Sequence, residues 1–125
     1  VRYSGRLVLQ DVYEVLQRYG RHPDADPAHD YLIDMSRVTE FEMDFADMMQ
    51  HVSRLRIYYP VRAPGARTAY VSPGDVAFGM TRMFQSLADG TLPAEIAVFR
   101  SMEEACDFLG IAPGRDREAL LRQSA

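Results

Sequence analysis

The fold of this chain of 125 residues depends on the stretch Tyr31-Leu32-Ile33-Asp34-Met35-Ser36. A strand that is buried on both faces must carry apolar side chains on both faces, so a continuous apolar run with a polar end is its expected signature. The stretch has this signature. We therefore predict that residues 31–35 form the central strand of a sheet that lies between layers of helix.

Helical and strand patterns alternate on both sides of this stretch. Apolar residues recur at helical spacing in segments that begin near Gln10, Asp44, Ser72 and Ser101. Short apolar runs predict further strands at residues 1–4, 67–71 and 95–99. Strands separated by helices predict an α/β domain with a mainly parallel sheet of four or five strands, helices packed against it and right-handed connections.

Several residues carry local predictions. Gly5 is expected to interrupt the first strand, and residues 37–43 are expected to form a connection after the central strand. Ser72 and Ser101 each precede an acidic residue by three positions, which is the spacing of a helix cap. We therefore expect both serines to accept hydrogen bonds from the first turn of a helix.

Size and composition indicate one domain. The length fits a domain at residues 1–110 and a tail at 111–125 that contains a short docked helix. A net charge of −4 without a basic run argues against nucleic-acid binding, and no apolar run approaches the ~20 residues of a membrane span. The lone cysteine, Cys106, excludes an intramolecular disulfide and fits a reducing cytoplasm.

The central stretch and the segments after it resemble a known family. Residues 31–39, followed by 41–49, are similar to STAS and SpoIIAA-like proteins, in which an apolar strand ends near an Asp and leads through a Val-Thr turn into a helix. The later segments that agree are 67–71, 79–84 and 98–109. The similarity covers residues 1–110 and points to the bacterial branch labelled STAS/SEC14-like. It implies a superhelix of strand-helix units with four or five strands.

The resemblance implies a regulatory or protein-interaction module rather than an enzyme. The best-known members of the family are anti-sigma-factor antagonists, which are switched by phosphorylation of a serine at the start of the second helix. The matching turn here, Met43-Asp44-Phe45-Ala46-Asp47, contains no serine, and Ser36 lies on the other side of the turn. We therefore expect contact with a protein partner or a second copy of the chain, without that switch.

Polar residues at the carboxyl ends of the predicted strands form one candidate site, because ligands of parallel sheets bind there. The residues expected at this edge are Asp34, Ser36, Arg37, Ser72, Asp75, Arg100 and Ser101. They either bind a polar ligand or partner, or serve only as helix caps and as partners of neighbouring amides and arginines. An enzyme is the weakest hypothesis, since no acid-base pair is evident beyond Asp34 with Arg37.

No cofactor or metal site is predicted. Acidic residues occupy the first turns of the predicted helices, where they would repel phosphate, and the chain contains no glycine-rich phosphate loop. His22, His29 and His51 lack the spacing of metal ligands, and we expect His51 at the surface or an edge. Cys106 lies on an apolar helical face and is expected to be a small buried hydrophobe.

Methionine and aromatic residues of the second and third helices indicate an alternative function. The set comprises Met43, Met48, Met49, Met80, Met83, Phe45, Phe78, Phe84, Tyr58 and Tyr59. These side chains either fill an ordinary core or line a cavity for a small apolar, lipid-like ligand. A closed core with a partner surface at Asp44, Phe45 and Met48 would favour the interaction module, whereas an internal apolar cavity would favour a carrier or sensor. Residues 58–61 are a candidate for self-association.

Overall fold

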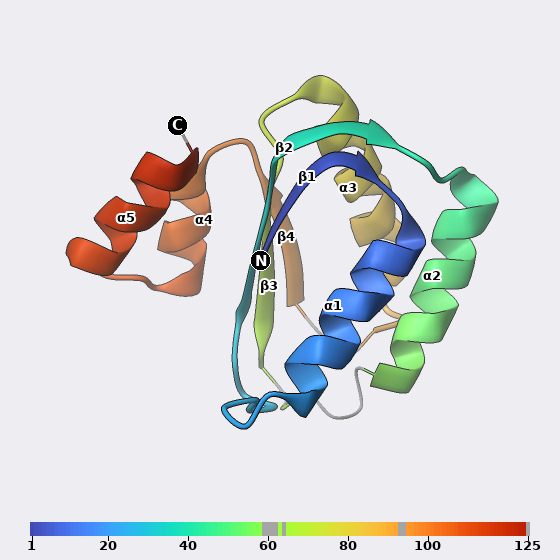
Figure 1. Ribbon diagram of the computed structural model, residues 1–125, viewed down its shortest axis with the longest axis horizontal. Coiled ribbons are helices and arrows are strands. Elements are labelled where there is room, and N and C mark those ends of the chain that lie inside the picture. Colours follow the sequence, from blue (N-terminus) through green and yellow to red (C-terminus); the bar gives the residue numbers. More distant parts are fainter. Residues whose placement is uncertain (59–62, 64, 93–94, 125) are drawn as a thin grey trace.

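The computed structural model describes residues 1–58, 63, 65–92 and 95–124, and Figure 1 shows their arrangement. The elements in chain order are β1 (Arg2–Leu7), α1 (Leu9–Arg21), β2 (Tyr31–Phe41), α2 (Phe45–Tyr58), β3 (Arg67–Val71), α3 (Asp75–Ala88), β4 (Glu95–Phe99), α4 (Met102–Leu109) and α5 (Arg115–Ser124). The predicted candidate for self-association at 58–61 lies mostly outside the described residues. None of the described helices is long and apolar enough to cross a membrane.

In the described part of the chain, four strands form one parallel sheet in the order β1-β2-β3-β4. The predicted α/β class with a parallel sheet is therefore confirmed. Strand β2 pairs with a different neighbour through each of its halves: residues 31–34 pair with β3, and residues 34–41 pair with β1. The central stretch of the sequence is thus an inner strand.

The predicted connection at 37–43 is wrong, because β2 continues to Phe41. The edge of β1 gives this polar segment a hydrogen-bonding partner, with Ser4 beside Arg37 and Leu7 beside Phe41. The prediction for Gly5 is also wrong. Gly5 adopts a left-handed φ of 69° and lies at an irregularity of the register, but β1 continues through it to Leu7.

Helices cover both faces of the sheet (Figure 1). Because the strands follow one another in chain order and parallel connections are right-handed, α1, α2 and α3 must lie on the same face, and α4 and α5 cover the other. One core cluster contains Met48, Val52, Leu55 and Phe84 from α2 and α3. Another contains Ala69, Val71, Met102, Ala105 and Cys106, and the tail docks on it through Leu120 and Leu121.

The helix caps follow the predictions in part. Ser101 accepts a hydrogen bond from the Glu104 amide at 3.2 Å, and Asp44 accepts one from the Asp47 amide at 2.8 Å. Ser72 does not cap α3. Gly74 precedes that helix instead, and Ser72 is fully buried, with its hydroxyl oxygen 3.1 Å from that of Thr81, within hydrogen-bond distance.

Replacement of Ser101 by Ala removes the cap of α4. We expect the free energy of unfolding to fall by about 1 kcal/mol, because an amide of the first turn then lacks its acceptor. Urea denaturation measures this change. Ser86→Ala is the matched control, since Ser86 is exposed inside α3, where Ala is the better helix former. Equal losses in both variants would contradict the role of the cap.

Candidate functional site

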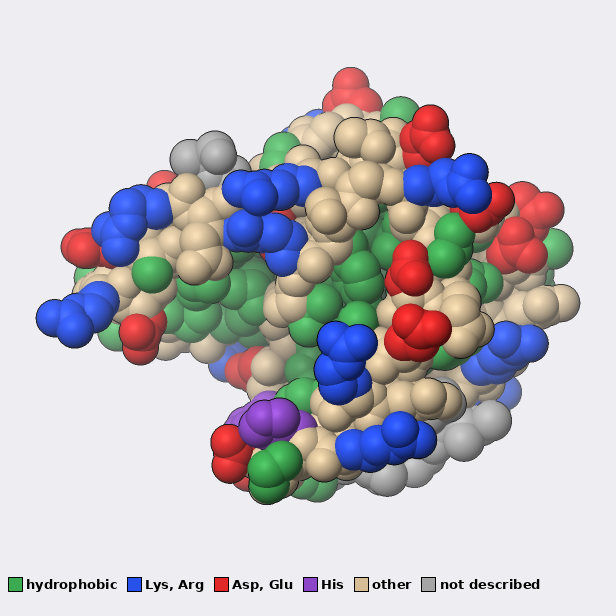
Figure 2. Space-filling model, viewed as in Figure 1, with side chains coloured by type: hydrophobic (Ala, Val, Ile, Leu, Met, Phe, Trp, Pro, Cys, Tyr) green, Lys and Arg blue, Asp and Glu red, His purple; other side chains and the backbone are tan. Residues whose placement is uncertain are grey.

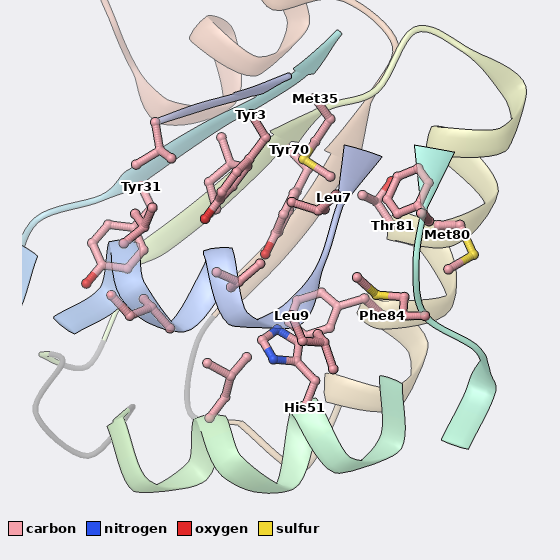
Figure 3. A pocket seen from close by; sticks show the side chains of 18 of the residues that line it. Tyr3, Leu7, Leu9, Tyr31, Met35, His51, Tyr70, Met80, Thr81 and Phe84 are labelled. Atoms are coloured by element: carbon pink, nitrogen blue, oxygen red, sulfur yellow. The ribbon is translucent and has the colours of Figure 1, made fainter. Parts of the chain in front are cut away.

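A cavity of about 240 Å³ lies between the sheet and the helices α1, α2 and α3. Figure 3 shows side chains of the sheet and of the helices pointing into it. Its wall is mostly aliphatic and aromatic, and includes Tyr3, Leu7, Leu9, Val12, Val15, Leu16, Tyr31, Ile33, Met35, Met48, His51, Leu55, Tyr70, Met80, Thr81 and Phe84. The cavity is therefore an apolar site within the helical layer.

Long aromatic side chains separate the helices from the sheet. Tyr3, Tyr31 and Tyr70 belong to the neighbouring strands β1, β2 and β3 and point toward the helices (Figure 3). Edge-to-face ring contacts hold two of them: Tyr31 lies 5.4 Å from Tyr19 of α1, and Tyr70 lies 5.7 Å from Phe84 of α3, between ring centroids. These rings form a rigid wall and leave space between them.

The cavity reaches the surface between β1 and α1. Figure 2 shows apolar side chains in the space framed by these two elements. Tyr3 of β1 and Val12 and Val15 of α1 line the cavity and are only half-buried. A ligand therefore has a path to the cavity along α1.

His51 is the most deeply buried titratable side chain in the cavity wall, with 6% of its surface exposed. Its ring lies 5.4 Å from the ring of Tyr13 and 5.5 Å from that of Phe84, and Nδ1 is 3.2 Å from the Tyr13 hydroxyl oxygen. Burial, helped by the nearby charge of Arg54, lowers the pKa of His51 to about 4. The imidazole is therefore neutral at pH 7. The predicted surface position of His51 is wrong.

The other polar groups of the wall are neutral or already bonded. Burial, with a contribution from Asp11, raises the pKa of Tyr3 to about 12, so its phenol keeps its proton. The Thr81 hydroxyl donates to the Ala77 carbonyl oxygen at 2.8 Å. Asp30 lines one end of the cavity, but its carboxylate is paired with Arg67 at 3.2 Å. The environment favours an uncharged occupant.

The polar residues predicted from strand ends lie at separate places. Asp34 is buried and accepts hydrogen bonds from Arg2 Nε at 3.2 Å and from the Ser36 amide at 2.9 Å. Arg37 donates to the Gln123 carbonyl oxygen of α5 at 3.4 Å. Since side chains alternate along a strand, Asp34 points away from the cavity that Ile33 and Met35 line.

The remaining predicted residues divide between the sheet edge and α2. Arg100 pairs with Asp75 at 2.8 Å and lies over the Phe78 ring. Asp44 caps α2, and Phe45 next to it is 54% exposed. Met48 and Met80 both line the cavity. The structure thus brings these two methionines together, whereas Asp34, Ser36, Arg37, Asp44, Phe45, Ser72 and Arg100 lie outside the cavity wall.

The sequence analysis proposed Met43, Met48, Met80 and Phe84 of the wall, but not its tyrosines or its histidine. Tyr3, Tyr70 and His51 were not proposed as site residues. A signal for His51 existed, because it follows Met48 by three positions and precedes Leu55 by four, which places it on the buried stripe of α2. No such signal exists for Tyr3 and Tyr70, because the register of strands β1, β2 and β3 decides whether their side chains lie close together.

Among the described residues, no group of three or more His, Cys, Asp or Glu side chains is arranged to hold a metal ion. Cys106 is fully buried in the other core cluster, and burial raises the pKa of its thiol. Comparison of the chain with models of known protein families, with curated proteins and with solved structures gave no match.

Burial of neutral His51 predicts acid sensitivity. Below pH 6.5 the unfolded chain binds a proton at this residue, whereas the folded chain binds it only near pH 4. Between these values stability is expected to fall with decreasing pH by about 1.4 kcal/mol per unit, or roughly 3 kcal/mol in total. Urea denaturation between pH 7 and pH 4 measures it. Above pH 6.5 this residue should not make the free energy of unfolding depend on pH.

The comparison that isolates His51 uses His51→Leu, which removes the titrating group and should show a shallower pH dependence than the wild type. His22→Gln is the control, because His22 is exposed on the loop after α1 and its replacement should preserve the wild-type slope. An unchanged slope in His51→Leu would show that the folded protein protonates this residue as readily as the unfolded chain.

Proposed function

We propose that this chain is a non-enzymatic protein that binds a small apolar ligand in the cavity beneath α1. The observation that carries the proposal is the 240 Å³ apolar cavity itself. An engineered apolar cavity of about 150 Å³ in another protein stays free of water and binds benzene. The cavity here is larger, and its wall is of the same chemical kind.

The energetic cost of an empty cavity supports an occupant. Cavities in protein cores cost about 24 cal/mol of stability per Å³. For a closed space of 240 Å³ this would amount to roughly 6 kcal/mol, and because the cavity here reaches the surface, that figure is an upper limit for its cost. A ligand that fills the space recovers much of this energy.

The size and electrostatics of the cavity define the ligand class. Pockets for drug-sized molecules have volumes of about 300–1,000 Å³, so this cavity suits a smaller molecule, such as one aromatic ring or a short acyl chain. Of the polar groups in its wall, His51 and Tyr3 are neutral at pH 7, and the Asp30 carboxylate is paired with Arg67. A histidine with a pKa of about 4 is also a poor general base at that pH. Both properties favour binding over catalysis.

The kinship with SpoIIAA-like proteins remains part of this proposal. It is supported by the succession of four strand-helix units whose strands follow chain order in the sheet. The resemblance likewise implies a superhelix of strand-helix units with four or five strands. A STAS/SEC14-like domain without the phosphorylated serine would then act as a carrier or sensor of a small molecule.

A second candidate function is contact with a partner protein through the start of α2. Phe45 is 54% exposed and Met49 is 50% exposed, and their spacing of four residues places them side by side on the helix. A stable interface buries about 800 Å² on each partner. Two side chains supply only a fraction of that area, so the cavity is the better supported site.

The proposed function is tested with toluene, titrated into the ¹⁵N-labelled chain and followed by NMR. We expect shifts of amides around the cavity and a dissociation constant on the order of 1 mM or lower, which lies within the ligand efficiency of so small a molecule. Val15→Phe places a ring in the cavity and should weaken binding at least about tenfold, because it occupies the ligand's space.

The matched control for Val15→Phe is Gln17→Phe, which adds the same ring to an exposed position of α1 outside the cavity wall. It should bind toluene as the wild type does. Absence of toluene binding by the wild type, or equal weakening in both variants, would overturn the proposed function.

The second candidate predicts that Phe45→Ser combined with Met49→Ser abolishes self-association measured by sedimentation equilibrium and leaves toluene binding unchanged. Both side chains are exposed, so the replacements should alter stability by less than about 0.5 kcal/mol each. If the wild type is a monomer at all accessible concentrations, self-association through this surface is excluded.

A further inference from the structure

His51 presents to the cavity a polar atom, Nε2, for which the described residues supply no hydrogen-bond partner. Its Nδ1 contacts the Tyr13 hydroxyl at 3.2 Å. Among the described residues, no hydrogen bond involves Nε2, although the side chain is 94% buried. The ring extends from α2 toward the sheet and lines the cavity (Figure 3), and Nε2 lies on the side of the ring far from Cβ. Nε2 is therefore directed at the space that a ligand would fill.

The hydrogen bond with Tyr13 determines which nitrogen carries the proton. The Tyr13 side chain is buried, with 8% of its surface exposed, and His51 Nδ1 is the acceptor within reach of its hydroxyl among the described residues. If Nδ1 carried the proton, the phenol proton would have no acceptor. If the phenol donates to Nδ1, both groups are satisfied, and the proton of the neutral imidazole resides on Nε2.

Because an unpaired buried donor is destabilising, the cavity favours an occupant that supplies an acceptor. We propose that the Nε2–H of His51 is the group that selects the ligand, and that the ligand is a small uncharged molecule, mainly apolar, with one carbonyl oxygen as its hydrogen-bond acceptor. This inference rests on the proposed function, since it specifies the chemistry of the ligand in the same cavity.

The surroundings of His51 favour a neutral carbonyl over a carboxylate. Tyr13 of α1 and Phe84 of α3 contact its ring, and neither carries a charge at pH 7. The nearest cation, Arg54, lies over the ring of Tyr13 at 5.4 Å from its centroid, where its charge interacts with that ring. A carboxylate in this apolar cavity would lose its hydration without gaining a direct cationic partner, which is costly.

A pair of ligands that differ in one group tests the inference. Acetophenone and isopropenylbenzene have nearly the same shape, but a carbonyl in the first is replaced by a carbon-carbon double bond in the second. NMR titrations of the wild type should show that acetophenone binds about tenfold more tightly, the effect of one added hydrogen bond. Equal affinities, or a preference for isopropenylbenzene, would overturn the inference.

The variant His51→Leu assigns the preference to this side chain. It should bind isopropenylbenzene at least as tightly as the wild type does and should lose the preference for acetophenone, because the donor is gone while the apolar wall remains. A preference that persists in this variant would overturn the assignment to His51. If neither compound binds the wild type, the proposed function itself is wrong. If both compounds bind equally, the proposed function stands and only the role of His51 in selecting the ligand is wrong.

A measurement on the wild type keeps the inference testable if His51→Leu does not fold. The ¹⁵N chemical shifts of histidine report which ring nitrogen carries the proton. We expect the Nε2–H form of His51 in the free protein, with an Nε2 resonance that moves on addition of acetophenone and stays in place on addition of isopropenylbenzene. A proton on Nδ1, or the same response to both compounds, would contradict the inference.

Discussion

The staggered pairing of β2 is the constraint on which the other features depend. Residues 31–34 bond to β3 and residues 34–41 to β1, so β1 is displaced along the sheet relative to β3. Helix α1 follows β1 after one residue and runs back over the sheet (Figure 1). The right-handed connections then place α2 and α3 beside it. Tyr3, Tyr31 and Tyr70 point from the strands toward these helices, and the cavity is the space that remains between the tyrosine side chains and the helices.

Charge is kept away from this space. The arginines at positions 2, 67, 100 and 117 each pair with an aspartate, and these pairs lie at the strand ends and around α4 and α5. Ion pairs with a partner at the surface contribute about 0–1 kcal/mol each, and only Asp34 among these aspartates is buried, so burial of apolar surface must supply most of the stability. The consequence for the cavity is a wall in which uncharged dipoles, rather than charges, distinguish one occupant from another.

The sequence predicted the order of elements because that order depends on local periodicity. Residues 31–35 were predicted as an inner strand and are part of one, although Tyr31, Leu32 and Ile33 are only half-buried, and the cap at Ser101 was found from spacing alone. The extension of β2 to Phe41 was missed, since its polar side chains are stabilised as a strand only by pairing with β1. The cavity residues Met48 and Met80 were proposed from composition. His51 was not proposed, although its spacing from Met48 and Leu55 places it on the buried stripe of α2; only its contacts with Tyr13 and Phe84 depend on other helices.

The irregular outer strand has a consequence for the behaviour of the chain in concentrated solution. Strand β1 borders the sheet, and its register shifts twice, before Ser4 and after Gly5. A regular border offers evenly spaced amide and carbonyl groups to any extended peptide, and can seed fibres. Here the left-handed φ of 69° at Gly5 interrupts that spacing on β1, and the exposed side chains of Arg2 and Arg6 carry charge. The border of β1 is therefore a poor template for another molecule, which disfavours polymerisation through this side of the sheet.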